Sequence, residues 1–189
     1  MSINSDNISI EPNVPATMRD GVILRADIYR PAGTEPLPVL LCRTPYDKQS
    51  TRLVNDALRM AARDYTVAVQ DVRGRYASDG KFRWMFGDEY CEDVDGYDSV
   101  EWAATLPGST GKVGTYGLSY DAWVQWELAT LRPPHLVAMA PSGIPLRLLD
   151  LTYGIFETGR RLRWNYSMSV ELPGQGRHHH WTTNPARGQ

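Results

Sequence analysis

Residues 112–123 read KVGTYGLSYDAW, and this stretch decides the fold. A run of β-branched and aromatic residues ends at Gly117, Ser119 follows two residues later, and helix-compatible residues continue from there. This order predicts a strand, a sharp turn and a helix, a layout that lifts one hydroxyl clear of a sheet. Ser119 is therefore the candidate nucleophile. The alternative is that Ser119 only caps the helix.

The sequence on either side of this stretch alternates between strand and helix patterns. Three continuously apolar runs predict strands that are buried on both faces: residues 38–42, 66–70 and 136–141. Helical periodicity separates them, and the acidic residues Glu89, Glu92 and Asp93 suit the N-terminus of one such helix. Repeated strand-helix-strand units imply an α/β protein with a mostly parallel sheet and helices on both faces. The chain begins differently, because Asp20 and Gly21 between two strand-like runs predict an antiparallel hairpin.

The composition limits the classes of function. The chain has 189 residues, 42% of them hydrophobic and 22% charged, which suits one soluble globular domain. A net charge of -2 gives no reason to expect nucleic acid or a membrane as a partner. The polar N-terminus lacks the features of a secretory signal, so we expect a cytoplasmic protein. Cys42 and Cys91 form neither a metal-spaced pair nor a disulfide framework, and each is expected to be a small core residue.

Acyl transfer by a serine needs donors for the developing oxyanion as well as a nucleophile. The backbone N–H of Tyr120, the first residue of the predicted helix, is the expected first donor, and the helix dipole adds to its effect. A second donor is expected from the loop that follows the strand ending at Cys42, and Tyr46 lies in that loop. We expect no cofactor and no metal in this chemistry.

Four motifs occur in order along the chain: MRDGV at 18–22, RTPYDK at 43–48, QDVRG at 70–74 with SDG at 78–80, and GLSY at 117–120. In order and spacing they resemble the cocaine esterase and X-Pro dipeptidyl-peptidase family of α/β-hydrolases, up to Gly154. The resemblance implies an α/β-hydrolase fold and a serine hydrolase that cleaves a small ester or a peptide amide. It also implies an oxyanion hole formed by the Tyr46 hydroxyl and the Tyr120 N–H. The family pattern is Gly-x-Ser-Tyr-x-Gly, from which this chain departs at Ala122.

Other charged residues follow the predicted strands at the edge of the sheet where α/β sites gather. Asp71 and Arg73 are candidates for catalytic groups by their position. The resemblance implies instead that they hold a loop in place and form a buried ion pair. Asp47 and Lys48 are interpreted in the same way. In family members that act on α-amino acid esters, carboxylates of an inserted helical region bind the substrate amine, and Asp150 is the candidate for that part.

The expected domain organisation follows from the same resemblance. Residues 1–141 are predicted to form the first part of an α/β-hydrolase core, 142–172 the start of a helical cap insertion, and 173–189 an irregular tail. We therefore expect a sheet that is truncated before its last strands. Such a sheet exposes an apolar edge, which predicts self-association.

The catalytic base is the part of the mechanism that the sequence does not supply clearly. Hydrolases of this fold place the triad acid and histidine after the nucleophile in the chain. His135 is predicted to lie on a surface loop away from Ser119, and His178, His179 and His180 follow without an intervening strand or a clear acid. Two hypotheses stay open: an active serine hydrolase, or a catalytically inactive fragment that lacks the triad acid and histidine.

Overall fold

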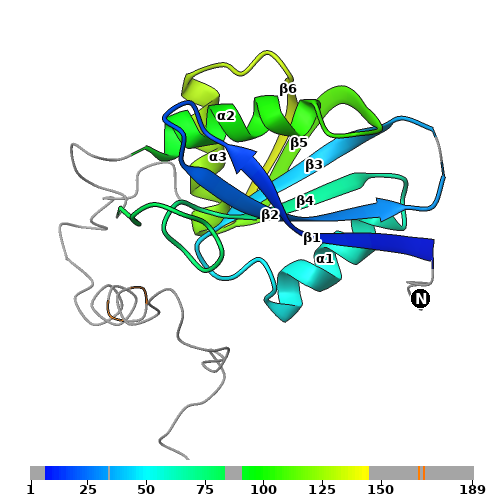
Figure 1. Cartoon of the computed structure of the whole chain (residues 1–189), viewed down its shortest axis with the longest axis horizontal. Helices are drawn as coiled ribbons and strands as arrows, with labels where there is room; N and C mark the ends of the chain where they lie inside the picture. Colours follow the sequence, from blue (N-terminus) through cyan, green and yellow to red (C-terminus); the bar gives the residue numbers. More distant parts are fainter. Residues whose placement is uncertain (1–6, 34, 84–90, 145–165, 167, 169–189) are drawn as a thin grey trace, which may run out of the picture.

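The computed structural model describes residues 7–33, 35–83, 91–144, 166 and 168. Within this part of the chain, six strands form one sheet in the order β1-β2-β4-β3-β5-β6 (Figure 1). The strands are β1 (Ile8–Thr17), β2 (Ile23–Pro31), β3 (Leu37–Thr44), β4 (Thr66–Asp71), β5 (Ser109–Leu118) and β6 (Leu136–Ser142). The helices are α1 (Thr51–Ala61), α2 (Glu92–Ala104) and α3 (Tyr120–Thr130).

The sheet is antiparallel on one side and parallel on the other. β2 pairs in antiparallel register with β1 and β4, whereas β3 lies parallel to β4 and β5, and β5 lies parallel to β6. The turn between β1 and β2 closes through a hydrogen bond from the Met18 N–H to the Val22 carbonyl, with Gly21 at a φ of 84°. The predicted hairpin and the mostly parallel α/β sheet are therefore confirmed.

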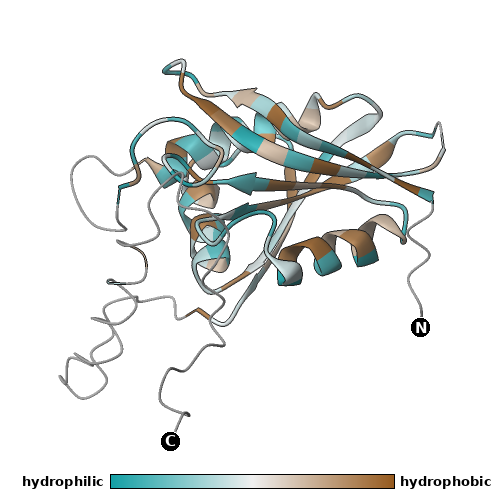
Figure 2. Ribbon diagram, turned by 60° about the horizontal axis from the view of Figure 1, so that its bottom comes forward, coloured by the Kyte–Doolittle hydropathy of each residue, from teal (hydrophilic) through white to brown (hydrophobic). Residues whose placement is uncertain are grey.

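Helices cover both faces of the sheet, as the sequence predicts. Figure 1 shows α1 on one face and α2 with α3 on the other. Alternation of side chains along β3 explains this arrangement. Leu41 packs in the cluster that includes Val100 of α2 and Leu128 of α3, whereas Cys42 packs with Leu53 of α1. Figure 2 shows hydrophobic residues along the strands and both hydrophobic and hydrophilic residues along α1, as expected for a helix with one buried side.

The parallel strands end together at one edge of the sheet, which we call the carboxyl edge. In register, Thr44 of β3 lies opposite Asp71 of β4, and Leu118 of β5 lies opposite Ser142 of β6. The segments that follow β3, β4 and β5 therefore leave the sheet at this edge. Ligand sites of open α/β sheets occur at the carboxyl ends of the strands.

Two predictions about burial are wrong. Residues 136–141 are predicted to be buried on both faces and do lie in a strand, β6. Most side chains of this strand are exposed, however, and Val137 is 60% exposed. The reason is that β6 is the outermost strand of the sheet in the described part of the chain. Cys42 is a fully buried core residue, whereas Cys91 is half-buried at the start of α2, where its thiol lies 3.5 Å from Asp95 Oδ2.

The predicted units at 142–172 and 173–189 lie almost wholly outside the described residues. Met168 is described, and its backbone carbonyl accepts a hydrogen bond of 2.9 Å from Arg75 Nη1. Among the residues that the structure describes, no helix has both the length and the apolar character needed to cross a bilayer.

Candidate active site

Ser119 occupies the turn between β5 and α3 in a strained backbone conformation. Its φ is 63° and its ψ is -118°, outside the regions that non-glycine residues favour. Such a conformation costs on the order of 1–3 kcal/mol and persists only where the surroundings enforce it. Here the Ser119 N–H donates to the Ser142 carbonyl at 2.9 Å, and the Ser119 carbonyl accepts from the Ala122 and Trp123 N–H groups at 3.0 Å. The turn is thus held from both sides, and its side chain is half-buried at the carboxyl edge.

Close contact between β5 and α3 requires glycine before this turn. A Cβ atom at Gly117 would lie 2.4 Å from the Cβ of Asp121 and 2.8 Å from the Asp121 backbone. Two residues after Ser119, by contrast, the chain carries Asp121, and Ala122 follows where the family pattern has glycine. Ala122 is fully buried in the first turn of α3, so the structure accommodates this departure from the pattern.

The structure brings Tyr46 and Tyr120 together at the carboxyl edge. Their rings pack edge to face with centroids 6.4 Å apart. This follows from the strand order, since β3, which precedes Tyr46, is the neighbour of β5, which precedes Tyr120. The Tyr46 N–H donates to Thr44 Oγ1 at 3.1 Å, which fixes the chain as it leaves β3. The Tyr120 N–H is the first of α3 and lies next to Ser119, at the end of the helix that favours anions.

The Tyr120 side chain is held by a buried ion pair. Its hydroxyl donates to Glu92 Oε1 at 3.2 Å, and Glu92 Oε2 lies 2.8 Å from Arg43 Nη2. All three side chains are at most 4% exposed. Burial raises the pKa of Glu92, while its contacts with Arg43 and Tyr120 act in the opposite direction. The sequence predicts only that Glu92 lies at a helix N-terminus, and it assigns Arg43 no role of its own. A charged residue at the end of a buried strand is the feature that could have pointed to Arg43.

A second buried cluster clamps the loop that carries Tyr46. The Lys48 N–H donates to Asp71 Oδ1 at 2.8 Å, and Lys48 Nζ lies 3.1 Å from Asp27 Oδ1 and 3.7 Å from Asp71 Oδ2. Burial raises the pKa of Asp71 to about 7. Asp47 accepts a hydrogen bond of 2.9 Å from the Gln49 N–H and shapes a turn. The structural interpretation of Asp71 and Lys48 is confirmed.

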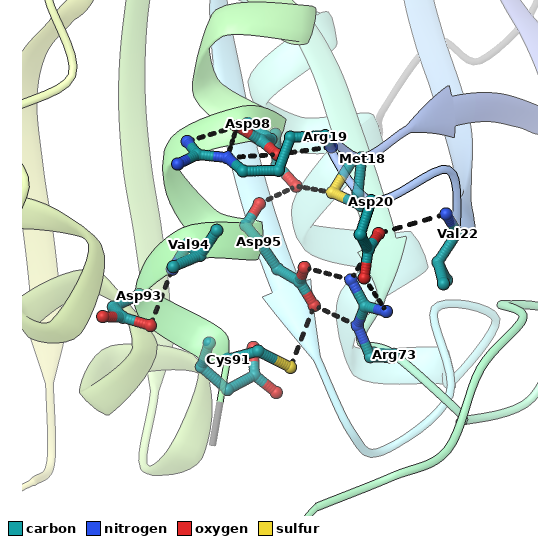
Figure 3. A network of polar contacts seen from close by, with 12 residues as sticks. Met18, Arg19, Asp20, Val22, Arg73, Cys91, Asp93, Val94, Asp95 and Asp98 are labelled. Carbon is teal, nitrogen blue, oxygen red and sulfur yellow. Dashed lines mark hydrogen bonds and ion pairs between the residues drawn. The ribbon is translucent and has the colours of Figure 1, made fainter. Parts of the chain in front are cut away.

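Arg73 belongs to a separate network on the hairpin side of the sheet (Figure 3). Its guanidinium lies 2.6 Å from Asp95 Oδ1 and 2.8 Å from Asp20 Oδ2. The hydrogen bonds that it donates to these two carboxylates raise the pKa of Arg73. The network continues on α2, where Arg19 pairs with Asp98 at 2.7 Å. Arg73 therefore joins the hairpin turn to α2, and the expected ion pairs of Asp71 and Arg73 form with different partners.

His135 lies at the edge of the sheet opposite to Ser119. Its carbonyl accepts a hydrogen bond of 2.9 Å from the Val113 N–H, six residues before Ser119 on β5 and its turn, and its Nδ1 lies 2.7 Å from Glu101 Oε2. The prediction of a surface loop away from the nucleophile is confirmed. Asp150 and the histidines at 178–180 lie outside the described residues. Within the residues that are described, no three His, Cys, Asp or Glu side chains converge to hold a metal ion.

Comparisons with known proteins agree on one family. The profile described as X-Pro dipeptidyl-peptidase (S15 family) matches residues 20–183. The chain is 40% identical over 141 residues to "Cocaine esterase" of Rhodococcus sp. (strain MB1 Bresler), an alignment that covers 72% of this chain and 24% of that protein. It is 30% identical over 151 residues to a putative serine esterase of Mycobacterium tuberculosis, covering 66% of this chain and 23% of the relative.

Solved structures show the same likeness. A CocE/NonD family hydrolase from Staphylococcus aureus superposes with a TM-score of 0.73 and 26% identity, over 87% of this chain and 33% of that one. An aminopeptidase from a marine sediment Thaumarchaeota archaeon superposes with a TM-score of 0.76 and 24% identity, over 95% of this chain and 33% of that one, and shows the fold alone. The α/β-hydrolase fold is therefore established. The chain spans 23–33% of the length of these relatives.

Proposed function

This chain belongs to the X-Pro dipeptidyl-peptidase family S15, and we propose that it is a serine hydrolase that acts through a Ser119 acyl-enzyme. Ser119 Oγ attacks the carbonyl carbon of an ester or amide while its proton passes to a base. The base then protonates the leaving alcohol or amine as the carbon–oxygen or carbon–nitrogen bond breaks. Water attacks the acyl-enzyme by the same route, which releases the acid and restores the serine.

The observation that carries this proposal is the strained backbone of Ser119. A positive φ at a non-glycine residue between a strand and a helix is what a nucleophile elbow needs, because the sharp turn projects Oγ away from the sheet. An ordinary N-cap has a β-region backbone and accepts a hydrogen bond from the helix through its side chain. Ser119 has neither feature, because its side chain makes no capping hydrogen bond. The geometry therefore favours the nucleophile over the capping alternative.

Two groups are proposed as the oxyanion hole: the Tyr120 backbone N–H and the Tyr46 hydroxyl. The edge-to-face contact of the two rings supports this pairing, because it places the Tyr46 loop against the residue that follows the nucleophile. A phenol with a pKa of ~10 is a neutral donor at pH 7. Donors aimed at the developing oxyanion are worth about 10²- to 10³-fold each in rate.

The base is proposed to come from residues outside the described ones. The described histidine, His135, lies at the opposite edge of the sheet and is paired with Glu101. In the α/β-hydrolase order the acid and the histidine follow the nucleophile. Residues 178–180 supply three histidines after Ser119. Loss of the base costs on the order of 10⁴- to 10⁶-fold in rate, so a chain without one would be inactive.

The substrate is proposed to be a small ester or a peptide amide. The family is described as an X-Pro dipeptidyl-peptidase, whereas two relatives are named as esterases, so amine and alcohol leaving groups both occur among these names. Hydrolysis of p-nitrophenyl acetate and of Gly-Pro-p-nitroanilide distinguishes the two classes. Hydrolysis of the anilide supports a dipeptidyl-peptidase, and hydrolysis of the ester without hydrolysis of the anilide supports an esterase.

Labelling with a fluorophosphonate probe tests the proposal directly, because the probe reacts only with an activated serine. The folded wild-type chain is compared with Ser119→Ala and with Ser142→Ala, a control whose serine lies next to Ser119 on β6. Labelling that is lost in Ser119→Ala and kept in Ser142→Ala would support the proposal. Replacing the histidines at 178–180 then tests them as the base. A folded wild-type chain that does not label would overturn the proposal in favour of an inactive chain.

A further inference from the structure

We propose that Glu92 is a positioning residue for the oxyanion hole, because it holds Tyr120, whose backbone N–H is the proposed donor. This inference rests on the proposed function and deepens it. Glu92 lies 28 positions before its partner, at the first residue of α2, and does not itself approach the reacting atoms. It acts on Tyr120 through the tyrosine hydroxyl.

The contacts of Glu92 leave its carboxylate little freedom. Oε1 accepts the Tyr120 hydroxyl at 3.2 Å, Oε2 lies 2.8 Å from Arg43 Nη2, and the Glu92 backbone carbonyl accepts from Arg43 Nη1 at 3.0 Å. Arg43 thus holds Glu92 by both its side chain and its main chain. The ion pair at Oε2 and the hydrogen bonds at Oε1 and at the backbone carbonyl together restrict where the Glu92 carboxylate can lie.

Arg43 in turn connects this anchor to the strand that leads to Tyr46. It lies in β3, three residues before Tyr46, and its Nε donates to Gln70 Oε1 at 3.1 Å. Gly96 makes room for α3 and for the guanidinium, since a Cβ there would lie 2.5 Å from the Cβ of Leu128 and 3.0 Å from Arg43 Nη1. One buried carboxylate therefore links the element that carries Tyr120 to the strand that carries the Tyr46 loop.

Packing alone does not account for this arrangement. A phenylalanine ring would fill the site of Tyr120 without a buried hydroxyl, which is costly unless it is hydrogen-bonded. A buried ion pair such as Arg43 with Glu92 adds little net stability, because desolvation offsets the attraction. Its effect is to fix geometry, and a catalytic group displaced by about 1 Å can lose 10²-fold in rate. Glu92 therefore fits a positioning role better than a stabilising one.

Tyr120→Phe is the central variant, because it removes the hydroxyl and keeps the backbone donor. Glu92→Gln and the double variant complete a cycle. Tyr116→Phe is the matched control: its hydroxyl is also buried and near the turn, and it has no hydrogen-bond partner among the described residues. Each variant is checked for folding by thermal melting. Two quantities are measured: the rate of fluorophosphonate labelling at Ser119 and the NMR resonance of the Tyr120 amide.

We expect Tyr120→Phe and Glu92→Gln each to slow labelling about tenfold, less than the 10²- to 10³-fold for removing a donor outright. The double variant should be no slower than the slower single one, Tyr116→Phe should match the wild type, and Glu92→Gln should move the Tyr120 amide resonance. If Glu92→Gln does not fold, Tyr120→Phe decides the question alone. Labelling of Tyr120→Phe at the wild-type rate, or additive effects in the cycle, would overturn the positioning role.

The failure of the proposed function gives a different result. A folded wild-type chain that does not label contradicts the serine hydrolase proposal itself. The amide resonance then decides the positioning role, because it does not depend on a catalytic base. A Tyr120 amide that moves in Glu92→Gln and not in Tyr116→Phe supports the role, and an unmoved amide overturns it.

Discussion

Arg52 Nη2 lies 2.7 Å from Asp121 Oδ2, and this ion pair joins the first turn of α1 to the first turn of α3. Asp121 is fully buried, whereas 41% of the Arg52 side chain is exposed. Burial raises the pKa of Asp121 to about 6, although the hydrogen bond from Arg52 acts in the opposite direction. The residue two positions after the proposed nucleophile therefore changes its charge near neutral pH.

Replacing Arg52 by methionine should destabilise the fold more at pH 8 than at pH 5. At pH 8 the buried Asp121 carboxylate is ionised and loses its partner, a change that costs about 3 kcal/mol. At pH 5 the carboxyl is mostly protonated and the cost should be below about 1 kcal/mol. Urea denaturation at both pH values measures the difference. Asp56→Asn is the control, because Asp56 lies 3.9 Å from Arg52 on the surface and its loss should matter little. Equal losses at the two pH values would contradict the assignment.

Asp121→Asn should flatten the dependence of stability on pH. The folded-state pKa of about 6 lies above the reference value of 3.8. The protonated group therefore stabilises the fold fully below the unfolded-state pKa, and this contribution is lost as the pH rises through about 6. Relative to Asp121→Asn, the wild type should lose about 2 kcal/mol between pH 4 and pH 7. Asp71 titrates in both proteins, so its contribution cancels in this comparison. Parallel curves of unfolding free energy against pH would show that Asp121 does not titrate in this range.

The sequence predicts local features of the site well and long-range pairs poorly. The turn at Ser119 and the place of Tyr46 follow from apolar runs and the residues that interrupt them, because the strand pattern is local. The pairs Arg52 with Asp121 and Glu92 with Tyr120 join residues 69 and 28 positions apart, and no periodicity in the chain indicates them. Val137 shows the same limit, since an apolar run does not tell whether a strand is central or outermost.

Ser119→Gly should be about 1 kcal/mol more stable than Ser119→Ala. Glycine adopts a positive φ without steric cost, so it relieves strain of about 1–3 kcal/mol. Its greater freedom in the unfolded chain lowers the stability by about 0.5–1 kcal/mol, which offsets part of this gain. Unfolding in urea measures the difference. At Ser142, whose φ is not positive, the same pair of substitutions should give the opposite order. A Ser119→Gly variant less stable than Ser119→Ala would mean that the turn is not strained.

Tyr46→Phe should slow fluorophosphonate labelling of Ser119 by about 10²-fold, because the proposed oxyanion donor is lost while the ring stays in place. The unfolding free energy should change by less than about 1 kcal/mol, since the packing of Tyr46 against Tyr120 does not need the hydroxyl. Tyr65→Phe is the control, because Tyr65 is exposed and precedes β4. Labelling of Tyr46→Phe at the wild-type rate would remove Tyr46 from the oxyanion hole.

We propose that the chain self-associates through β6, and Val137→Lys should prevent this. Val137 is 60% exposed on the strand that is outermost in the described part of the chain, and a lysine on such a strand opposes edge-to-edge pairing. Sedimentation velocity over a range of concentrations measures the association. Ile10 on β1, at the other edge, is 51% exposed and provides the matched variant Ile10→Lys.

The two edges should differ because β1 is already poorly suited to pairing. It contains Pro12 and Pro15, and its register with β2 shifts between Glu11 and Val14. Proline removes a backbone donor and a bulge twists the edge away, so both features block a further strand. Ile10→Lys should therefore leave the association unchanged. Loss of association in Ile10→Lys and not in Val137→Lys would place the contact on β1, and a wild-type chain that stays monomeric throughout would exclude both edges.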